Sequence, residues 1–169
     1  MDFGHYTTQG AARAADLVNT LQTDVGFDRP EAVPAAAEWT TANAERLRDV
    51  ARHLRRVFAT DDDAEAATTL NDLLRGLPIT PRLSTHDDKP AHLHYAPDDA
   101  DDVTRIACNA TMAVTAIVSE HGVGRLSLCA RPACGTAFVD TSRNGQRRFC
   151  GPACANRTHV AAHRRRTAP

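Results

Sequence analysis

The chain has 169 residues and a formal net charge of −1, and 24% of its residues are charged. This length supports one modest hydrophobic core and a small metal-stabilised module, but not two large domains. No stretch approaches the roughly 20 apolar residues that a membrane-spanning helix needs, and the polar first ten residues lack the pattern of a secretion signal. We therefore expect a soluble cytoplasmic protein without membrane contact.

The charge is divided unevenly along the chain. Residues 1–124 carry 11 Lys and Arg against 20 Asp and Glu, a net of −9, whereas residues 125–169 carry nine Arg against one Asp, a net of +8. We interpret these segments as two domains. A compact basic module on an acidic body indicates a surface that contacts nucleic acid, and the alternative is a merely solvated basic tail.

The N-terminal domain begins with helical patterns. A short helix is expected over residues 16–21, after the small-residue run 11–15. Gly26, Pro30 and Pro34 mark a loop after it.

Two further helices are expected before residue 80. A continuous apolar stripe over residues 41–58 predicts the clearest helix of the chain. The acidic run 61–63 is typical of a helix N-terminus, and the helix that it starts should stop at Gly76 and Pro78.

A β-hairpin is expected next. Residues 82–85 and 92–95 alternate with the period of half-buried strands around the turn-forming segment 87–90. His92 and His94 share one face, which we interpret as the ordinary polar face of a hairpin rather than a second metal site.

A long helix should close the N-terminal core. Residues 97–99 open it, and His121 and Gly122 end it. Cys108 falls on its apolar side and is interpreted as a small buried core residue. The domain is therefore expected to hold three or four helices around a small hairpin, with no motif that favours catalysis.

Two close cysteine pairs are the strongest chemical signal of the chain. Four thiolates presented as two pairs suit tetrahedral Zn²⁺, because each short loop clamps one edge of the tetrahedron. One structural Zn²⁺ with no position left for water is therefore expected, which disfavours a zinc enzyme. The predicted ligands are Cys129, Cys134, Cys150 and Cys154.

Two alternatives to four cysteine ligands deserve comparison. Disulfides are disfavoured, because the expected compartment is reducing and the cysteine count of five is odd. His159 and His163 have the spacing of a two-Cys two-His finger, but 24 residues separate Cys134 from His159 where such fingers have about 12.

The module is expected to run in the order knuckle, hairpin, helix. A strand at 125–128 leads into the first pair, residues 136–140 pair with 147–150 across the turn 142–145, and a helix starts at Gly151-Pro152. This is the treble-clef order, so the whole chain is predicted to be α+β with a mostly helical N-terminal domain.

Exposed basic and amide side chains of the module are the predicted nucleic-acid contacts. Guanidinium groups bind phosphates or guanine edges. For Asn156 and Arg157 the alternative is that they brace the metal loop. The predicted contacts are Arg143, Asn144, Arg147, Arg148, Asn156, Arg157, Arg164 and Arg165.

The segments 138–144 and 147–150, with Cys154-Ala155-Asn156-Arg157 and the basic helix, resemble the CGNR zinc finger of bacterial proteins. That family carries an N-terminal ABATE domain, to which residues 15–20 and Trp39 are similar. Ala155 replaces the glycine of the namesake motif. Alanine is favourable there if the position is ordinary helix, and costly if it needs a positive φ.

The resemblance implies a zinc-finger, DNA-binding transcription regulator of the stress response, working at the nucleoid. It also implies an N-terminal domain that senses a small-molecule effector or mediates assembly. A homodimer stays open, since many DNA-binding proteins are dimers, although no heptad pattern here requires one. Asp16, Asn19 and Trp39 are its candidate ligand residues, with a purely structural role as the alternative. A different class of function, a protein-interaction or RNA-binding module, also remains open.

Overall fold

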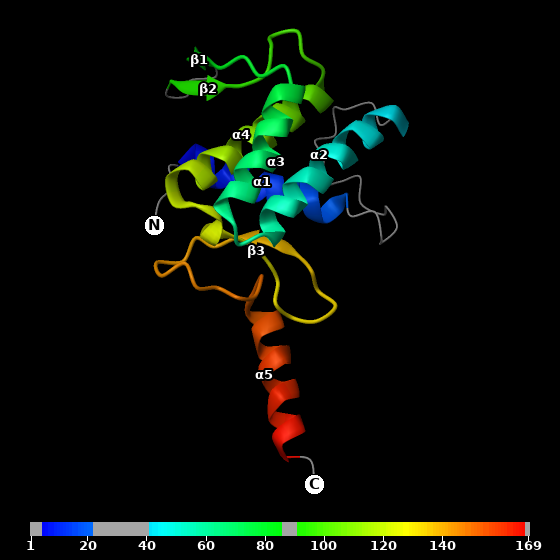
Figure 1. The fold of residues 1–169 in the computed structure, drawn as a ribbon, viewed down its shortest axis with the longest axis vertical. Helices are drawn as coiled ribbons and strands as arrows, with labels where there is room; N and C mark the ends of the chain where they lie inside the picture. The colour runs from blue at the N-terminus through cyan, green and yellow to red at the C-terminus, as the bar shows by residue number, and fades with distance from the viewer. Residues whose placement is uncertain (1–4, 22–40, 86–90, 168–169) are drawn as a thin grey trace.

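The computed structural model describes residues 5–21, 41–85 and 91–167. Four helices form a body, the β1–β2 hairpin lies at one end of it, and α5 projects from the opposite end (Figure 1). None of the helices in these ranges is long and apolar enough to cross a membrane. The helices are α1 (His5–Thr20), α2 (Thr41–Ala59), α3 (Asp63–Gly76), α4 (Asp102–His121) and α5 (Pro152–Thr167), with one 3₁₀ turn, η2 (Val123–Arg125).

The predicted α+β class is confirmed, with two small antiparallel sheets accompanying the helices. β1 (Arg82–Ser84) pairs with β2 (His92–His94), and β3 (Leu126–Leu128) pairs with β4 (Ala137–Val139). The predicted loop at Gly26, Pro30 and Pro34 and the predicted turn 87–90 lie outside the described residues.

Small residues let α1 pack closely along α4. Ala11 and Ala14 are fully buried, and a Cβ built on Gly10 would lie only 2.9 Å from the Cβ of Ala113. The helix predicted over 16–21 is present, but its predicted start was wrong, because α1 begins at His5. The alanine run continues the helix rather than preceding it, since alanine has the highest helix propensity.

The stripe predicted for α2 is confirmed. Leu47, Leu54 and Val57 are fully buried in the core shared with α1, α3 and α4. Asp62 caps α3, because its carboxylate accepts a hydrogen bond of 2.8 Å from the amide of Ala64. Cys108 is completely buried, as predicted, and burial raises the pKa of its thiol.

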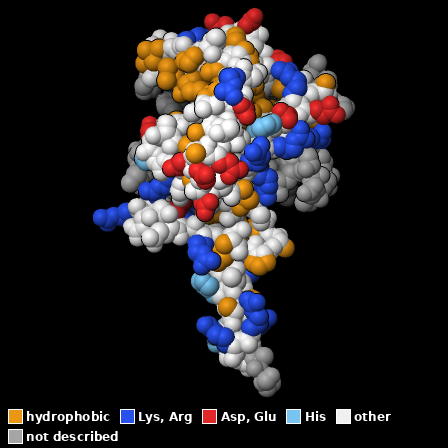
Figure 2. All heavy atoms as spheres, in the orientation of Figure 1, with side chains coloured by type: hydrophobic (Ala, Val, Ile, Leu, Met, Phe, Trp, Pro, Cys, Tyr) orange, Lys and Arg blue, Asp and Glu red, His pale blue; other side chains and the backbone are white. Residues whose placement is uncertain are grey.

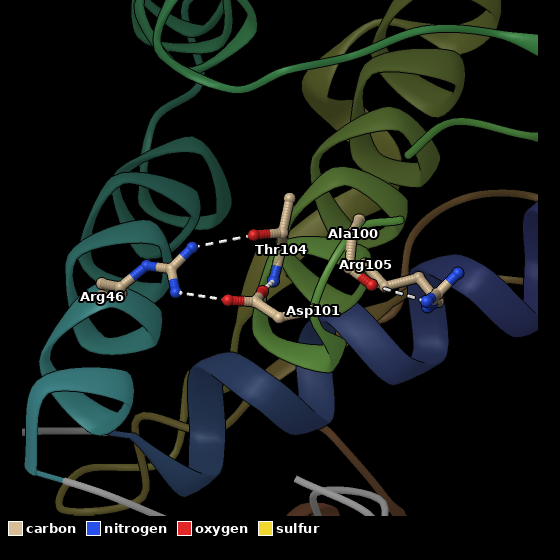
Figure 3. Close-up of polar contacts among 5 residues, drawn as sticks. All are labelled: Arg46, Ala100, Asp101, Thr104 and Arg105. Atoms are coloured by element: carbon tan, nitrogen blue, oxygen red, sulfur yellow. Dashed lines mark hydrogen bonds and ion pairs between the residues drawn. The ribbon is translucent and has the colours of Figure 1, made fainter. Parts of the chain in front are cut away.

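The start of α4 is set by Asp101 rather than by residues 97–99 as predicted. Its carboxylate accepts from the amide of Thr104 at 2.6 Å and from Arg46 of α2 at 2.8 Å (Figure 3). Arg46 also donates to the hydroxyl of Thr104 at 2.8 Å, so one guanidinium ties α2 to the first turn of α4. The side chain of Arg105 reaches back to the carbonyl of Ala100 at 2.6 Å.

Replacing Asp101 by alanine is expected to destabilise the fold by about 1 kcal/mol, the typical cost of losing an N-cap. Hydrogen bonds from Thr104 and Arg46 hold the pKa of Asp101 well below its usual range. A depressed folded-state pKa adds stability above the unfolded pKa of about 3.9, and this is lost as pH falls through the folded value. Urea unfolding at pH 7 should therefore separate the variant from wild type, and the gap should narrow below about pH 4. An equal loss from Asp99→Ala would contradict this account.

The hairpin faces are reversed relative to the prediction. Leu83 and Leu93 pair across β1 and β2 and are 68% and 52% exposed. His92 and His94 are half-buried, and their Nε2 atoms lie 3.0 Å apart. The histidines therefore do not form the exposed polar face.

The second predicted hairpin was also wrong in its pairing. β4 pairs with β3 in the register Leu126↔Val139, Ser127↔Phe138 and Leu128↔Ala137, and not with residues 147–150. Leu126 and Ala137 are buried in the same core as α1 and α2. The first strand pair of the zinc module is thereby packed on the helical body.

Candidate metal centre and basic surface

Four cysteine sulfurs converge between the β3–β4 hairpin and the start of α5. The Sγ atoms of Cys129, Cys134, Cys150 and Cys154 all lie within 4.8 Å of one another. Cys154 Sγ is 3.7 Å from the Sγ atoms of both Cys134 and Cys150, which are 3.9 Å from each other. A Zn–S bond of about 2.3 Å requires tetrahedron edges of about 3.8 Å. The cluster fits one structural Zn²⁺ and is too open for disulfides, whose sulfurs are about 2 Å apart.

The hairpin holds the first two cysteines in place. The amide of Cys129 donates to the carbonyl of Thr136 at 2.9 Å, and the amide of Cys134 donates to the carbonyl of Arg131 at 3.1 Å. Two left-handed residues flank Cys134 and turn the backbone there, with φ of 60° at Ala133 and 59° at Gly135. This tight turn brings both thiols to one side of the hairpin.

The second pair depends on the first turn of α5. The amide of Cys154 donates to the carbonyl of Gly151 at 3.1 Å, and Pro152 supplies the preset φ of a first helical residue. The amide of Cys150 lies 3.5 Å from Cys129 Sγ and donates to it. Ala155 lies inside α5, and its amide donates to the carbonyl of Gly151 at 3.2 Å. Alanine is therefore favourable at the position where the motif has glycine.

The thiols have opposite electrostatic surroundings. Hydrogen bonding to Thr136 lowers the pKa of Cys134 to about 6, whereas burial and neighbouring thiols raise the pKa of Cys150 to about 12. Neighbouring thiolates oppose one another's ionisation, and a divalent cation among them reverses this effect. Zn²⁺ is the chemistry that this donor set accommodates, because thiolate is one of its preferred ligands.

Sequence reasoning missed Arg131, which lies in the loop between the first two ligands. Its Nε donates to Cys154 Sγ at 3.2 Å and links the knuckle to α5. Its position between two predicted ligands could have indicated this role, since thiolates bound to zinc accept hydrogen bonds from nearby cations.

Asp140 is a second residue that sequence reasoning missed. It is 1% exposed, and its carboxylate accepts from the amides of Ser142 at 2.8 Å and Arg147 at 2.7 Å. Burial alone would raise its pKa, but these hydrogen bonds outweigh burial and lower it. The only acid of the module therefore shapes the turn that presents Arg143.

Two arginines near this turn have structural partners. Arg125 donates to the carbonyl of Ser142 at 2.7 Å. Arg147 donates to the carbonyl of Cys150 at 2.8 Å and lies 5.3 Å from the ring centroid of Phe138. Arg147, a predicted nucleic-acid contact, is thus placed where it braces the metal loop.

The remaining predicted contacts lie on the surface. Asn144 and Asn156 are exposed. Arg157 is also exposed, and it is Arg131 rather than Arg157 that contacts the cysteines. Six exposed arginines have guanidinium groups with no hydrogen bond or ion pair to any described residue, and we call them the basic set: Arg143, Arg148, Arg157, Arg164, Arg165 and Arg166.

The three candidate ligand residues of the N-terminal domain are placed differently from one another. Asn19 is occupied by the backbone of β4: its Nδ2 donates to the carbonyl of Ala137 at 2.9 Å, and its Oδ1 accepts from the amide of Ala137 at 2.7 Å. Asp16 is exposed on α1, and Trp39 lies outside the described residues. Asn19 therefore ties α1 to the strand that follows Cys134.

Replacing Asn19 by alanine is expected to destabilise the protein by about 1–3 kcal/mol, because both partly buried backbone groups of Ala137 lose their partner. Chemical denaturation of the zinc-loaded protein measures the effect. Asp16→Ala on the same helix serves as the control and should change stability by less than about 0.5 kcal/mol. Equal effects of the two substitutions would show that the amide does not join the two parts.

Comparison with known families agrees with this geometry. A family model named ABATE, described as "Putative stress-induced transcription regulator", matches residues 11–133, and the CGNR zinc finger model matches residues 125–167. The two matches overlap at 125–133, the segment that holds β3 and the first ligand. No curated protein matches the chain. The chain belongs to the ABATE family and carries a CGNR zinc finger over residues 125–167.

Proposed function

We propose that the chain regulates transcription by binding DNA through its zinc-ordered C-terminal module. The observation that carries this proposal is the basic set, six exposed arginines without partners among the described residues. They lie on a segment of net charge +8, or about +6 with a zinc tetrathiolate, attached to a body of net charge −9. Unpaired guanidinium groups on an ordered scaffold suit the phosphates of a duplex.

We assign different roles to residues 1–124 and residues 125–169. The C-terminal part contacts DNA at the nucleoid, and the N-terminal part senses an effector or mediates assembly. Figure 2 shows Lys and Arg side chains without acidic ones along the projecting α5, whereas the body carries acidic and basic side chains side by side. The acidic body repels phosphates, so this charge distribution favours an approach of DNA from the side of α5.

Neither catalysis nor single-stranded RNA binding suits this site. Four cysteine ligands fill a tetrahedral zinc site and leave no position for water or substrate. Phe138 is buried, and Phe149 is half-buried with its ring 6.1 Å from that of His159 in an edge-on contact. Phe138 therefore offers no free face on which an unpaired base could stack, and Phe149 is only partly exposed, which disfavours a stacking platform.

Selection of genomic DNA fragments by the purified, zinc-loaded protein tests the proposal. We expect fragments to be retained at low salt and released as salt rises. A protein that retains no DNA at low salt would refute it. The alternative, a protein-interaction module, is tested by capturing binding partners of the protein from cell extract with and without nuclease. A partner protein that is still captured after nuclease treatment would indicate such a module.

A further inference from the structure

Helix α5 packs against the rest of the module at its start, and one side of it is less exposed than the other. Cys154 is buried, and Thr158 and Ala162, which lie four and eight residues further along, are half-buried. These residues define the less exposed side of the helix, and we call the opposite side its outer side. Beyond its first turn, α5 extends away from the body (Figure 1).

The outer side carries three exposed residues of different chemistry in one line. Asn156, Val160 and Arg164 are spaced by four residues and therefore follow one another along a single stripe. Val160 is 49% exposed, which makes it one of three large apolar residues exposed among the described parts of the chain. Its neighbour Ala161 is exposed as well. Together with Arg157 and Arg165, these residues line a shallow hollow on the outer face of α5.

The dimensions of α5 match a DNA major groove. At 1.5 Å per residue its 16 residues span about 24 Å, and a helix with side chains is about 10–12 Å across, close to the groove width of about 12 Å. From Asn156 to Arg164 the stripe covers about 12 Å, which corresponds to about four base pairs.

The three side chains also match the chemistry of base edges. Asn makes paired hydrogen bonds to adenine, Arg does so to guanine, and an apolar side chain contacts the methyl group of thymine. An exposed valine contributes nothing to the electrostatic attraction of phosphates. It gains an apolar contact where a thymine methyl group lies against it.

We propose that α5 enters the major groove and that Asn156, Val160 and Arg164 read a short sequence of adenine, thymine and guanine. This inference rests on the proposed DNA-binding function and adds to it a source of sequence selectivity. Arg166 lies on another side of the helix, outside the hollow, and contributes charge without reading bases.

The test is selection of duplexes from a randomised pool by the zinc-loaded full chain. Wild type should enrich a motif, and Asn156→Ala, Val160→Ala and Arg164→Ala should each relax one part of it, with discrimination falling roughly 5- to 150-fold per position. Arg166→Ala removes the same charge as Arg164→Ala and is the matched control. It should weaken binding to all sequences alike and leave the motif intact.

All four substituted side chains are exposed, so the variants should fold as wild type does. Zinc content and circular dichroism verify each variant. Failure to retain any duplex at low salt would refute the DNA-binding function itself. Two outcomes would refute base reading by Asn156, Val160 and Arg164 while leaving DNA binding in place. One is that wild type retains duplexes but enriches no motif, and the other is that all three alanine variants enrich the same motif as wild type. Loss of the motif by Arg166→Ala to the same degree as by Arg164→Ala would also overturn it.

Discussion

Replacing Cys150 by serine is expected to lower the affinity for Zn²⁺ by more than about 100-fold, the upper end of what loss of an outer-shell partner costs. Binding of structural Zn²⁺ in finger peptides is worth about 10–16 kcal/mol, so the metal supplies most of the folding free energy of such a unit. The structure predicts which part should unfold. α5 and the turn that precedes it depend on the metal, whereas β3 and β4 are packed on the body through Leu126 and Ala137.

We therefore expect partial rather than global unfolding of the Cys150→Ser variant. Circular dichroism should lose the signal of about one helix, and the main thermal transition of the body should remain. Zinc analysis of the wild type should give one ion per chain. Ala153→Ser, an exposed position between two ligands, is the matched control and should behave as wild type. A full complement of zinc and intact α5 in Cys150→Ser would contradict the four-cysteine site.

The affinity for duplex DNA is expected to fall about 500-fold between 50 and 200 mM salt. This value follows if five members of the basic set neutralise phosphates while Arg164 contacts a base, because each neutralised phosphate contributes about −0.9 to the slope of log K against log salt. The expected slope is then about −4.5. A slope near zero would mean that the arginines do not contact phosphates.

A double substitution tests whether the salt slope comes from the arginines of α5. Arg165→Ala with Arg166→Ala should reduce its magnitude by about 1.8, since two contacts are removed. Arg75→Ala on α3, whose guanidinium pairs with Asp72, removes a positive charge from the body and should leave the slope unchanged. Equal effects of the two variants would indicate a response to net charge rather than local contacts.

The parts of the molecule that the sequence predicted are those determined by local spacing. The ligand set follows from two short cysteine intervals, and α2 follows from an apolar stripe that needs no partner to be recognised. The caps of α3 and the stop of α4 at Gly122, whose φ is 66°, are likewise local signals.

The parts that it did not predict depend on contacts between distant residues. The residue pattern of β4 is compatible with pairing to 147–150 or to β3. Ala137 is buried against the body, and this burial favours pairing with β3. Asn19 contacts a strand 118 positions away, and no local pattern indicates such a contact. The inner and outer sides of the β1–β2 hairpin were assigned by polarity, although Leu83 and Leu93 are the exposed pair.

The same distinction applies to the arginines. Composition reveals a basic module, but only the structure separates the bracing residues Arg125, Arg131 and Arg147 from the basic set. This separation changes the expected salt slope, because a guanidinium that already binds a carbonyl or a sulfur contributes less to phosphate binding.

The central claim is that zinc orders the arginines of the module for contact with DNA. The most direct measurement is the affinity of the full chain for duplex DNA at about 50 mM salt, with zinc bound and after removal of zinc by a chelator. The chain carries the same arginines in both cases, so only their order differs. We predict that removal of zinc weakens binding at least tenfold and that added zinc restores it. Equal affinity with and without zinc would contradict the claim, because the arginines would then act as a disordered basic tail.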